Sequence, residues 1–396
     1  MARITLENAR TLDAACERII TPSHDRTDPF CTHFARCGGC SLQHMNYAAQ
    51  LEEKQRHLAQ AFAQHGGLAP KTWLAPISGD SKGYRSRARL AVLRHRDGSG
   101  RGIGFRQRRS ERVELIELCP VLAPELQQLL APLNEIIRGL ERSECPNEIR
   151  IAVDDKGDLG ILFDGLINQA ALGQRLERLA NVAVVVFRSP AGESIFARGS
   201  ALDLWLEPAD GLNMRYTPGD FVQANNQINK RMVDQVVQRL DLTENESVLD
   251  LFCGLGNFTI ALAKRCREVT GIDLGLKLIE SARVNASLNQ LENVRFESSD
   301  LTQDPGPQRW ARAQYDAVLL DPPRAGAAGV LPTIARTKAH KIAYVSCYPG
   351  TMARDIRSLR DDYGYELEAA GIVDQFPQSH HVECVAFLSG EPRLYK

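Results

Sequence analysis

The stretch Val248-Leu249-Asp250-Leu251-Phe252-Cys253-Gly254-Leu255-Gly256-Asn257-Phe258 decides the fold of this chain. An apolar run leads into a glycine turn, and a helical stretch over residues 259–264 follows. Glycines at such a turn let the backbone approach a ligand at the N-terminus of a helix. A single G-x-G is weak evidence by itself, so the neighbouring segments have to support the interpretation.

Further apolar runs follow at residues 269–272, 294–297, 318–320 and 342–345, and they alternate with helical stretches such as 277–288. This alternation predicts a parallel sheet with helices on both faces. We therefore expect an α/β fold with a Rossmann-like domain over residues 206–396. Residues 31–205 begin with clustered cysteines and predict a smaller α+β central domain, with a half-buried strand at residues 148–153. Residues 1–30 form a separate N-terminal segment.

Acidic residues stand where the first three of these strands should end. Asp273 lies 23 residues after Asp250, at the position from which a carboxylate binds ribose hydroxyls. Asp300, after the third strand, can reach the edge of an adenine. The alternative is a structural turn with solvated carboxylates, but suitable groups at three consecutive strand ends favour a cofactor. A dinucleotide stays possible, although the missing third glycine and the acid in the first strand favour S-adenosylmethionine (SAM).

Two later strand ends carry reactive groups. Asp321 follows the fourth strand, and Cys347 follows the fifth, directly before Tyr348 and Pro349. Both tips should face the crevice in which such sheets bind ligands. Cys347 is a candidate nucleophile and Glu383 a candidate base. A free cysteine is more often a small buried residue, but the strand-tip position and the following proline favour catalysis.

Four cysteines form a separate candidate site: Cys31, Cys37, Cys40 and Cys119. Their spacing, with a remote fourth thiol next to Pro120, suits a cubane iron–sulfur cluster better than zinc. The spacing differs from the C-x3-C-x2-C of radical SAM enzymes, so we expect a structural cluster. Unrelated buried cysteines are the alternative.

The overall charge indicates no partner, because 48 basic and 49 acidic side chains leave a net charge of −1. Residues 82–112 are locally very basic, and alternation would place Arg85, Arg87 and Arg89 on one face of a strand. We expect RNA to bind there. No apolar run is long enough for a membrane span and no signal-peptide core is visible, so we expect no membrane contact and a cytoplasmic location.

Several of these motifs, in this order, resemble the RNA uracil-C5 methyltransferases, and most of all the members that act on 23S rRNA. The resemblance rests on Cys31-x5-Cys37-Gly38-Gly39-Cys40-x-x-Gln43-His44, the Leu249-to-Phe258 stretch, Leu320-Asp321-Pro322-x-Arg324-Ala325-Gly326, Ser346-Cys347, and Phe376-Pro377 to His381-x-Glu383. It implies SAM contacts at Gln223, Phe252, Asn257, Asp273, Asp300 and Asp321. It also implies Cys347 as nucleophile, Glu383 as base and a [4Fe–4S] cluster at the four cysteines.

The implied reaction is methylation of uracil C5 in 23S rRNA through a covalent bond from Cys347 to C6, on a flipped uridine in a loop, by a monomer. A tRNA uracil-C5 methyltransferase and a non-catalytic iron–sulfur RNA-binding protein are the alternatives. Two features depart from the family. Only 30 residues precede Cys31, so we expect the N-terminal TRAM domain to be absent or reduced to a remnant strand. Tyr348 stands where the family commonly has Asn.

Overall fold

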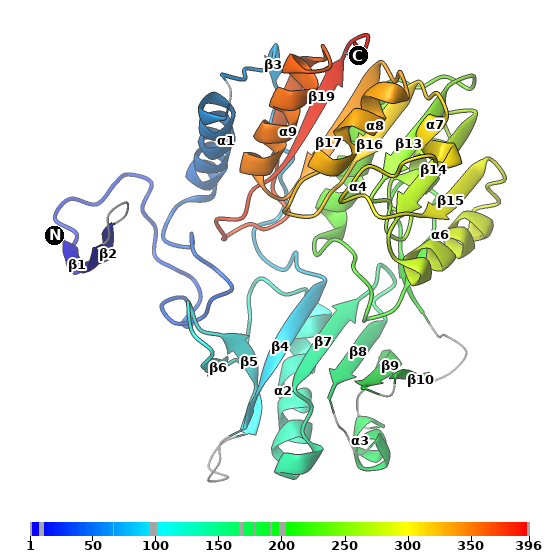
Figure 1. The fold of residues 1–396 in the computed structure, drawn as a ribbon. Coiled ribbons are helices and arrows are strands. Elements are labelled where there is room, and N and C mark those ends of the chain that lie inside the picture. The colour runs from blue at the N-terminus through cyan, green and yellow to red at the C-terminus, as the bar shows by residue number, and fades with distance from the viewer. Residues whose placement is uncertain are drawn as a thin grey trace.

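The protein is described by a computed structural model covering residues 2–7, 12–65, 67–94, 101–165, 169–177, 179, 181–190, 192–197 and 203–393. Two large sheets, one above the other in Figure 1, carry most of these residues. Within this part of the chain, no helix is long and apolar enough to cross a membrane.

The upper sheet has the strand order β15-β14-β13-β16-β17-β19-β18-β3. Its strands are β3 (Thr72–Trp73), β13 (Ser247–Leu251), β14 (Glu268–Asp273), β15 (Val294–Ser298), β16 (Ala317–Leu320), β17 (Lys341–Ser346), β18 (Glu366–Val373) and β19 (Glu383–Ser389). The five strands from β15 to β17 are parallel, and β19 runs antiparallel to both of its neighbours. The α/β, Rossmann-like prediction for this half of the chain is confirmed, and each predicted strand is found within one residue of its expected bounds.

Helices cover both faces of the upper sheet. One face packs against α4 (Asn226–Leu240), α5 (Thr259–Ala263) and α6 (Leu276–Leu288). The other packs against α1 (Tyr47–Gln64), α7 (Arg309–Arg312), α8 (Leu331–Arg336) and α9 (Pro349–Asp361). Residues of β13 alternate between the two cores, with Val248 in one and Leu249 in the other.

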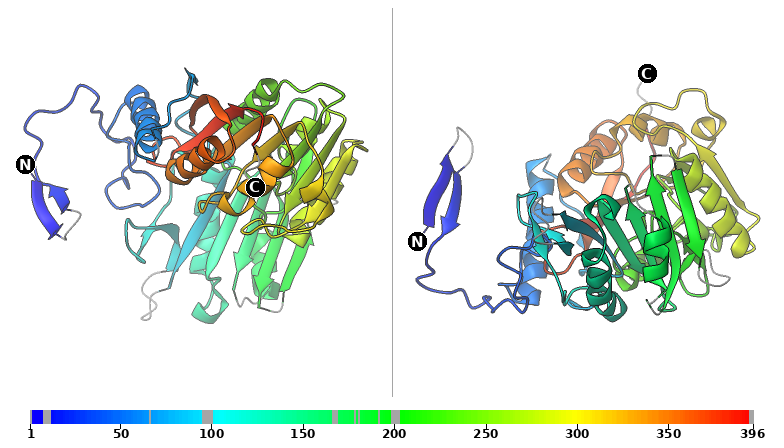
Figure 2. Two further views of the ribbon diagram at one scale, coloured as in Figure 1. Left: turned by 45° about the horizontal axis from the view of Figure 1, so that its top comes forward. Right: turned by 90° about the horizontal axis from the view of Figure 1, so that it is seen from below.

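The lower sheet has the order β10-β9-β8-β7-β4-β5-β6. Its strands are β4 (Arg87–Arg94), β5 (Arg101–Arg106), β6 (Val113–Leu115), β7 (Glu148–Val153), β8 (Leu159–Asp164), β9 (Val182–Ser189) and β10 (Gly192–Ala197). The helices α2 (Pro124–Arg138) and α3 (Gln169–Leu176) share a core with one face. The other face joins β11 (Leu204–Leu206), β12 (Met214–Tyr216) and α4 in a core that continues into the upper sheet. Figure 2 shows the two sheets from two further sides.

The N-terminal segment contains a hairpin of β1 (Ala2–Glu7) and β2 (Leu12–Cys16), which lies apart from the two sheets in Figure 1. The domain ranges 31–205 and 206–396 stay a prediction. The helix α1 and strand β3 of the first range pack on the sheet of the second, since β3 pairs with β18. The strand expected at residues 84–90 begins only at Arg87, because Arg85 forms an isolated bridge with Leu122.

Candidate active site

The register of the upper sheet brings the ends of its strands to one place. Ser346 of β17 pairs with Cys384 of the antiparallel β19. The next residue outward on each strand is therefore Cys347 and Glu383, respectively, and both lie at the same end of the sheet. Because β13, β14 and β16 are parallel neighbours, Asp273 and Asp321 reach the same edge.

A cavity of about 550 Å³ lies at this edge. All eight residues predicted to bind SAM or to act in catalysis line it, namely Gln223, Phe252, Asn257, Asp273, Asp300, Asp321, Cys347 and Glu383. The structure thus brings together side chains that are up to 160 positions apart in the sequence. The volume of this cavity is within the range of ordinary small-molecule sites.

The glycine turn after β13 has the backbone conformation that its sequence requires. Gly254 and Gly256 have φ values of +54° and +92°, and Phe252, between strand and turn, has +65°. Asp273 holds this turn from the next strand, because its two carboxylate oxygens accept the backbone N–H groups of Gly254 and Gly275, each at 3.0 Å. Each oxygen keeps a second lone pair for a ligand.

Asn257 is held by a partner that sequence reasoning missed. The side-chain amides of Asn257 and Asn229 exchange two hydrogen bonds of 2.8 and 3.0 Å. Asn229 lies on α4 and is fully buried. Its only signal in the sequence was a polar residue on the apolar face of that helix, a position that requires a partner. The apolar wall formed by Leu274 and Leu278 was also missed.

Three carboxyl groups here sit in surroundings that disfavour their charged form. Burial raises the pKa of Asp321 and of Asp250 to about 7. Burial, with the charge of Asp321 adding to it, raises the pKa of Glu383 to about 8, while Lys54 opposes the shift. Asp250 accepts a hydrogen bond from the Thr259 hydroxyl, but Oε2 of Glu383 has no partner in the part of the chain that the structure describes. Glu383 therefore lines the cavity with a buried carboxyl oxygen that has no hydrogen-bond partner among the described residues.

Cys347 is half-buried between this carboxyl and a cation. Burial and the charges of Glu383 and Asp321 raise the pKa of its thiol, whereas Arg324 lowers it. Arg324 also lies 6.0 Å from the ring of Tyr348, which is 47% exposed. Asp300, on the opposite side, is fixed by hydrogen bonds from Thr302, and these lower the pKa of its carboxyl.

The four predicted metal ligands also converge. Cys31, Cys37, Cys40 and Cys119 line a second cavity, together with Arg85. Burial raises the pKa of three of these thiols, that of Cys119 to about 12, and Arg85 opposes the shift in each case. Among the described residues, no three His, Cys, Asp or Glu side chains are arranged to hold a single metal ion.

The alternation expected in the basic stretch is present, since Ser86, Ala88 and Leu90 are buried, but Arg85, Arg87 and Arg89 on the other face have different partners. Arg87 is largely enclosed, since its Nη1 donates to the carbonyl oxygen of Val222 at 2.6 Å and its guanidinium covers Phe221; burial lowers the pKa of Arg87 to about 10. Arg85 donates to the carbonyl oxygen of Arg87 and faces the cysteines. Arg89 is exposed and pairs with Glu148. Arg87 differs from the other two arginines because Phe221 and Val222 contact its guanidinium. Arg96 lies outside the described residues.

The raised pKa values predict how stability varies with pH. Between about pH 4 and 8, the folded protein holds protons on Asp250, Asp321 and Glu383 that the unfolded chain has lost. Their contribution to stability is complete below about pH 4 and is lost as the pH rises through 7 to 8. We expect the melting temperature of the ligand-free protein to fall from pH 5 to 8.5, and to fall less in Asp321→Asn and Glu383→Gln. The exposed Glu280→Gln is the control, and equal slopes in all four proteins would contradict the interpretation.

Comparison with known proteins identifies the family of this chain. The family model described as tRNA (Uracil-5-)-methyltransferase matches residues 168–391. A 23S rRNA (uracil(1939)-C(5))-methyltransferase RlmD from Alkalilimnicola ehrlichii is 41% identical, covering 96% of this chain and 86% of the relative. The RlmD of Alcanivorax borkumensis is 39% identical, covering 98% and 88%.

A solved structure is similar along nearly the whole chain. It is the tRNA (uracil-54, C5)-methyltransferase of Pyrococcus abyssi in complex with S-adenosyl-L-homocysteine, with a TM-score of 0.70 and 26% identity, covering 94% of this chain and 88% of that one. Together with the strand-end site, these matches show that the chain belongs to the RNA uracil-C5 methyltransferase family.

Proposed function

We propose that this protein transfers a methyl group from SAM to C5 of a uridine in 23S rRNA, through a covalent bond between Cys347 and C6. The observation that carries the proposal is the meeting of Cys347, Glu383 and the strand-end carboxylates in one cavity. The relatives named above as enzymes of 23S rRNA are 39–41% identical to this chain, against 26% for the tRNA enzyme, which supports 23S rRNA over tRNA as the substrate. All eight groups come from one chain, so a single copy is sufficient to form the site.

The cavity suits SAM, whose sulfonium and ammonium groups are positive and whose ribose offers two hydroxyls. Asp273 has lone pairs left for the ribose, and the ionised Asp300 can accept from an adenine amino group. Asp321 lies buried next to the two reactive residues, so a cation beside it would favour its charged form. Gln223, Phe252 and Asn257 complete the wall. When bound, SAM supplies an electrophilic methyl group.

The chain's own residues supply the rest of the chemistry. Uracil C5 is a weak nucleophile, but addition of the Cys347 thiolate to C6 makes C5 an enolate carbon that can accept a methyl group. Arg324 is the cation placed to stabilise that thiolate. After methylation, the Glu383 carboxylate takes the C5 proton, the C5–H electrons form the C5=C6 double bond, and the C6–S bond breaks. Because Cys347 is half-buried, the uridine has to be unpaired or flipped out of its helix.

Substitution of the two reactive residues should stop the reaction at different points. Cys347→Ala should abolish methyl transfer to 23S rRNA while SAM affinity survives, because the thiol contacts the base. Glu383→Gln should permit attack and methylation but prevent release, so a denaturation-resistant protein–RNA adduct should accumulate on gels. Full activity of the first variant, or free turnover by the second, would contradict the mechanism, and an active wild type on tRNA alone would favour the alternative substrate.

We further propose that Cys31, Cys37, Cys40 and Cys119 hold a [4Fe–4S] cluster. Their thiols line one cavity, and four thiolates are the ligand set of such clusters. Zinc usually takes its thiolates as two closely spaced cysteine pairs, and the second pair is missing from this sequence. The cationic Arg85 beside them would stabilise the negative charge of a thiolate-bound cluster.

Metal analysis tests this assignment. Protein purified without oxygen should be brown and contain about four irons per chain. Cys37→Ser should lose both colour and iron, because three thiolates hold the cluster poorly. The exposed Cys16→Ser, which removes a thiol outside the cavity, should keep both. Colourless protein containing one zinc would show that the metal is wrong.

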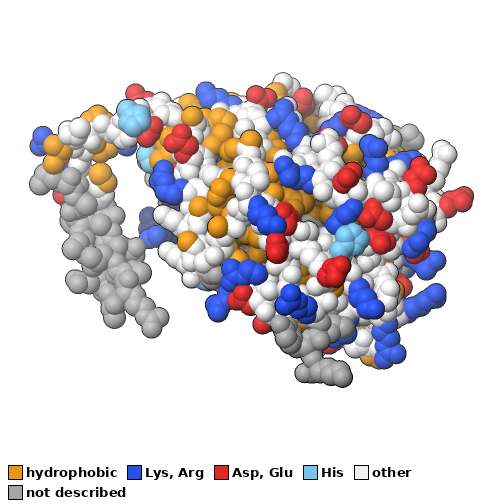
Figure 3. All heavy atoms as spheres, turned by 90° about the horizontal axis from the view of Figure 1, so that it is seen from above, with side chains coloured by type: hydrophobic (Ala, Val, Ile, Leu, Met, Phe, Trp, Pro, Cys, Tyr) orange, Lys and Arg blue, Asp and Glu red, His pale blue; other side chains and the backbone are white. Residues whose placement is uncertain are grey.

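We propose that RNA is bound along residues 82–112, through the arginines that remain exposed. Arg89 on β4 and Arg112 before β6 reach solvent, whereas Arg87 holds residue Val222. Arg108 stacks 4.8 Å from the ring of Phe34 and donates to the carbonyl oxygen of Cys40, so it connects this surface with the cysteines. Figure 3 shows that the upper face of the molecule, by contrast, mixes basic and acidic side chains.

Salt dependence separates the two kinds of arginine. The double variant Arg89→Ala/Arg112→Ala should weaken RNA binding and reduce the slope of log K against log salt by about 0.7–0.9 for each lost phosphate contact. Arg87→Ala should lower thermal stability and leave that slope unchanged, because its partner is the protein. The RNA surface lies elsewhere if the double variant retains both affinity and slope.

A further inference from the structure

The segment between β18 and β19, residues 374–382, leads directly to Glu383 and is held mostly by residues far upstream. The carbonyl oxygen of Gln378 accepts the backbone N–H groups of Ser41 and Leu42, at 2.8 and 2.9 Å. The side chains of Gln50 and Gln378 are hydrogen-bonded at 3.0 Å. Gln378 has a φ of +68°, a strained value that persists only where the surroundings impose it. Residues before and within α1 therefore hold this segment in place.

Lys54 on α1 is the charged member of this contact. Its Nζ donates to Oδ1 of Asp374 at 2.5 Å and to the carbonyl oxygen of Phe376 at 2.9 Å. Tyr47 donates its hydroxyl to the second oxygen of Asp374. Lys54 and Asp374 are 2% and 1% exposed. Buried ion pairs contribute little net stability, so stability alone does not explain why Lys54 and Asp374 are buried together.

The position of Glu383 explains why Lys54 is buried here, because the other charged groups that act on Glu383 directly are the carboxyl groups of Asp321 and Asp374. The ionisable groups that act on Glu383, or on Cys347 and Cys384 beside it, come from four strand ends and from α1: they are Lys54 on α1, Asp321 and Arg324 after β16, Cys347 after β17, Asp374 after β18, and Cys384 within β19. Lys54 is the cation that opposes the rise in the pKa of Glu383, which burial, Asp321 and Asp374 all promote. Without Lys54, burial, Asp321 and Asp374 would all raise the pKa of Glu383, and no cation that acts on Glu383 directly would oppose them.

We propose that Lys54 is a positioning residue for the base: its buried ammonium fixes the segment that leads to Glu383 and keeps that carboxylate able to accept a proton. The inference rests on the function proposed above. In the release step, Glu383 must be ionised to take the C5 proton while the C6–S bond breaks and Cys347 leaves as a thiolate. A protonated Glu383 would leave the methylated RNA bound to the protein.

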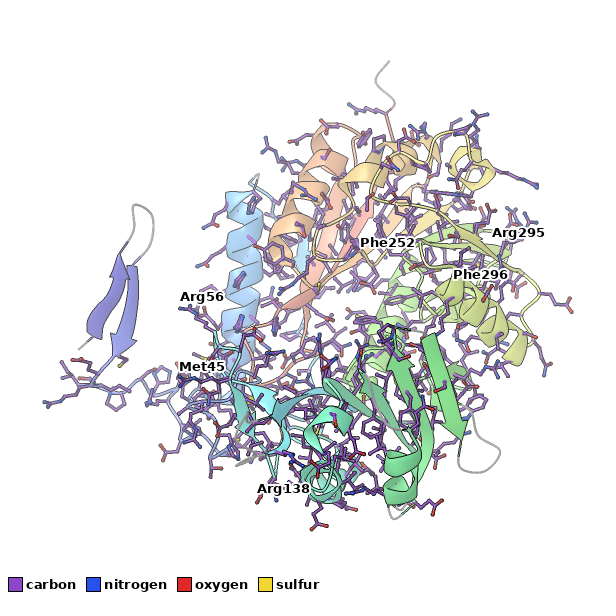
Figure 4. The ribbon with its side chains drawn as sticks, turned by 60° about the horizontal axis from the view of Figure 1, so that its bottom comes forward. Met45, Arg56, Arg138, Phe252, Arg295 and Phe296 are labelled. Atoms are coloured by element: carbon purple, nitrogen blue, oxygen red, sulfur yellow. The ribbon has the colours of Figure 1, made fainter. Side chains whose placement is uncertain are left out.

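The test uses the full-length protein, 23S rRNA transcript and SAM, and measures methyl transfer and RNA release separately from pH 6 to 9. Lys54→Met keeps the length of the side chain without its charge. It should slow release at neutral pH by about tenfold, accumulate the adduct, and move the acid limb of the release profile up by roughly one unit. SAM affinity should change less than twofold. Arg56→Met is the matched control, since Arg56 lies on the outer side of the same helix (Figure 4) and is 59% exposed.

A second variant separates charge from packing. Lys54→Met/Asp374→Asn removes both charges of the pair, so the acid limb should return towards that of the wild type. Asp374→Asn alone keeps the ammonium beside Glu383 and should move the limb to lower pH, which tests the proposal even if Lys54→Met does not fold. An unmoved limb in the single variants, with only stability lowered, would overturn the proposal. Failure of the wild type to methylate, or free turnover by Glu383→Gln, would instead overturn the function on which it rests.

Discussion

The antiparallel insertion of β19 between β17 and β18 is the constraint on which the site depends. In a purely parallel sheet, Glu383 would begin its strand at the edge opposite Cys347. With β19 reversed, the pairing of Ser346 with Cys384 places the start of one strand beside the end of the other. The proposed nucleophile and base, 36 positions apart in the sequence, thereby become neighbours. Cys347 directly follows β17 and Glu383 begins β19, so the pairing of these two strands holds their relative position.

Electrostatics then divides the cavity by function. Asp273 and Asp300 are bound to N–H and O–H donors, whereas Asp321 and Glu383 are buried and hold pKa values of about 7 and 8. Asp273 and Asp300 suit recognition of neutral groups of a ligand. The protonation of Asp321 and Glu383, by contrast, depends on the charges near them. A cation near Asp321 would favour the ionised form of that carboxyl group. Lys54 favours the ionised form of Glu383 in the same way. One carboxylate can thus serve binding and the other proton transfer at neutral pH.

Much of this arrangement could be predicted from the sequence, because strand-helix alternation and strand-end acids are local signals. The strands from β13 to β17 and the cavity residues Asp273, Asp300 and Asp321 are examples. Gln223, Phe252 and Asn257 were expected only from the family resemblance. What could not be predicted depends on distant partners. Arg87 looked like a free basic residue until Val222, 135 positions away, was found to accept its hydrogen bond. The two residues of β3 carry no periodicity, and Lys54 resembled any lysine of an amphipathic helix, although it is buried against Asp374.

The central claim is that this chain makes 5-methyluridine in 23S rRNA by way of Cys347. The most direct measurement is mass mapping of 5-methyluridine in the 23S rRNA and tRNA of cells that contain the protein, lack it, or carry Cys347→Ala. Our account predicts that one 5-methyluridine disappears from 23S rRNA without the protein, and that wild-type protein restores it while the variant does not. Unchanged 23S rRNA, or loss confined to tRNA, would contradict it.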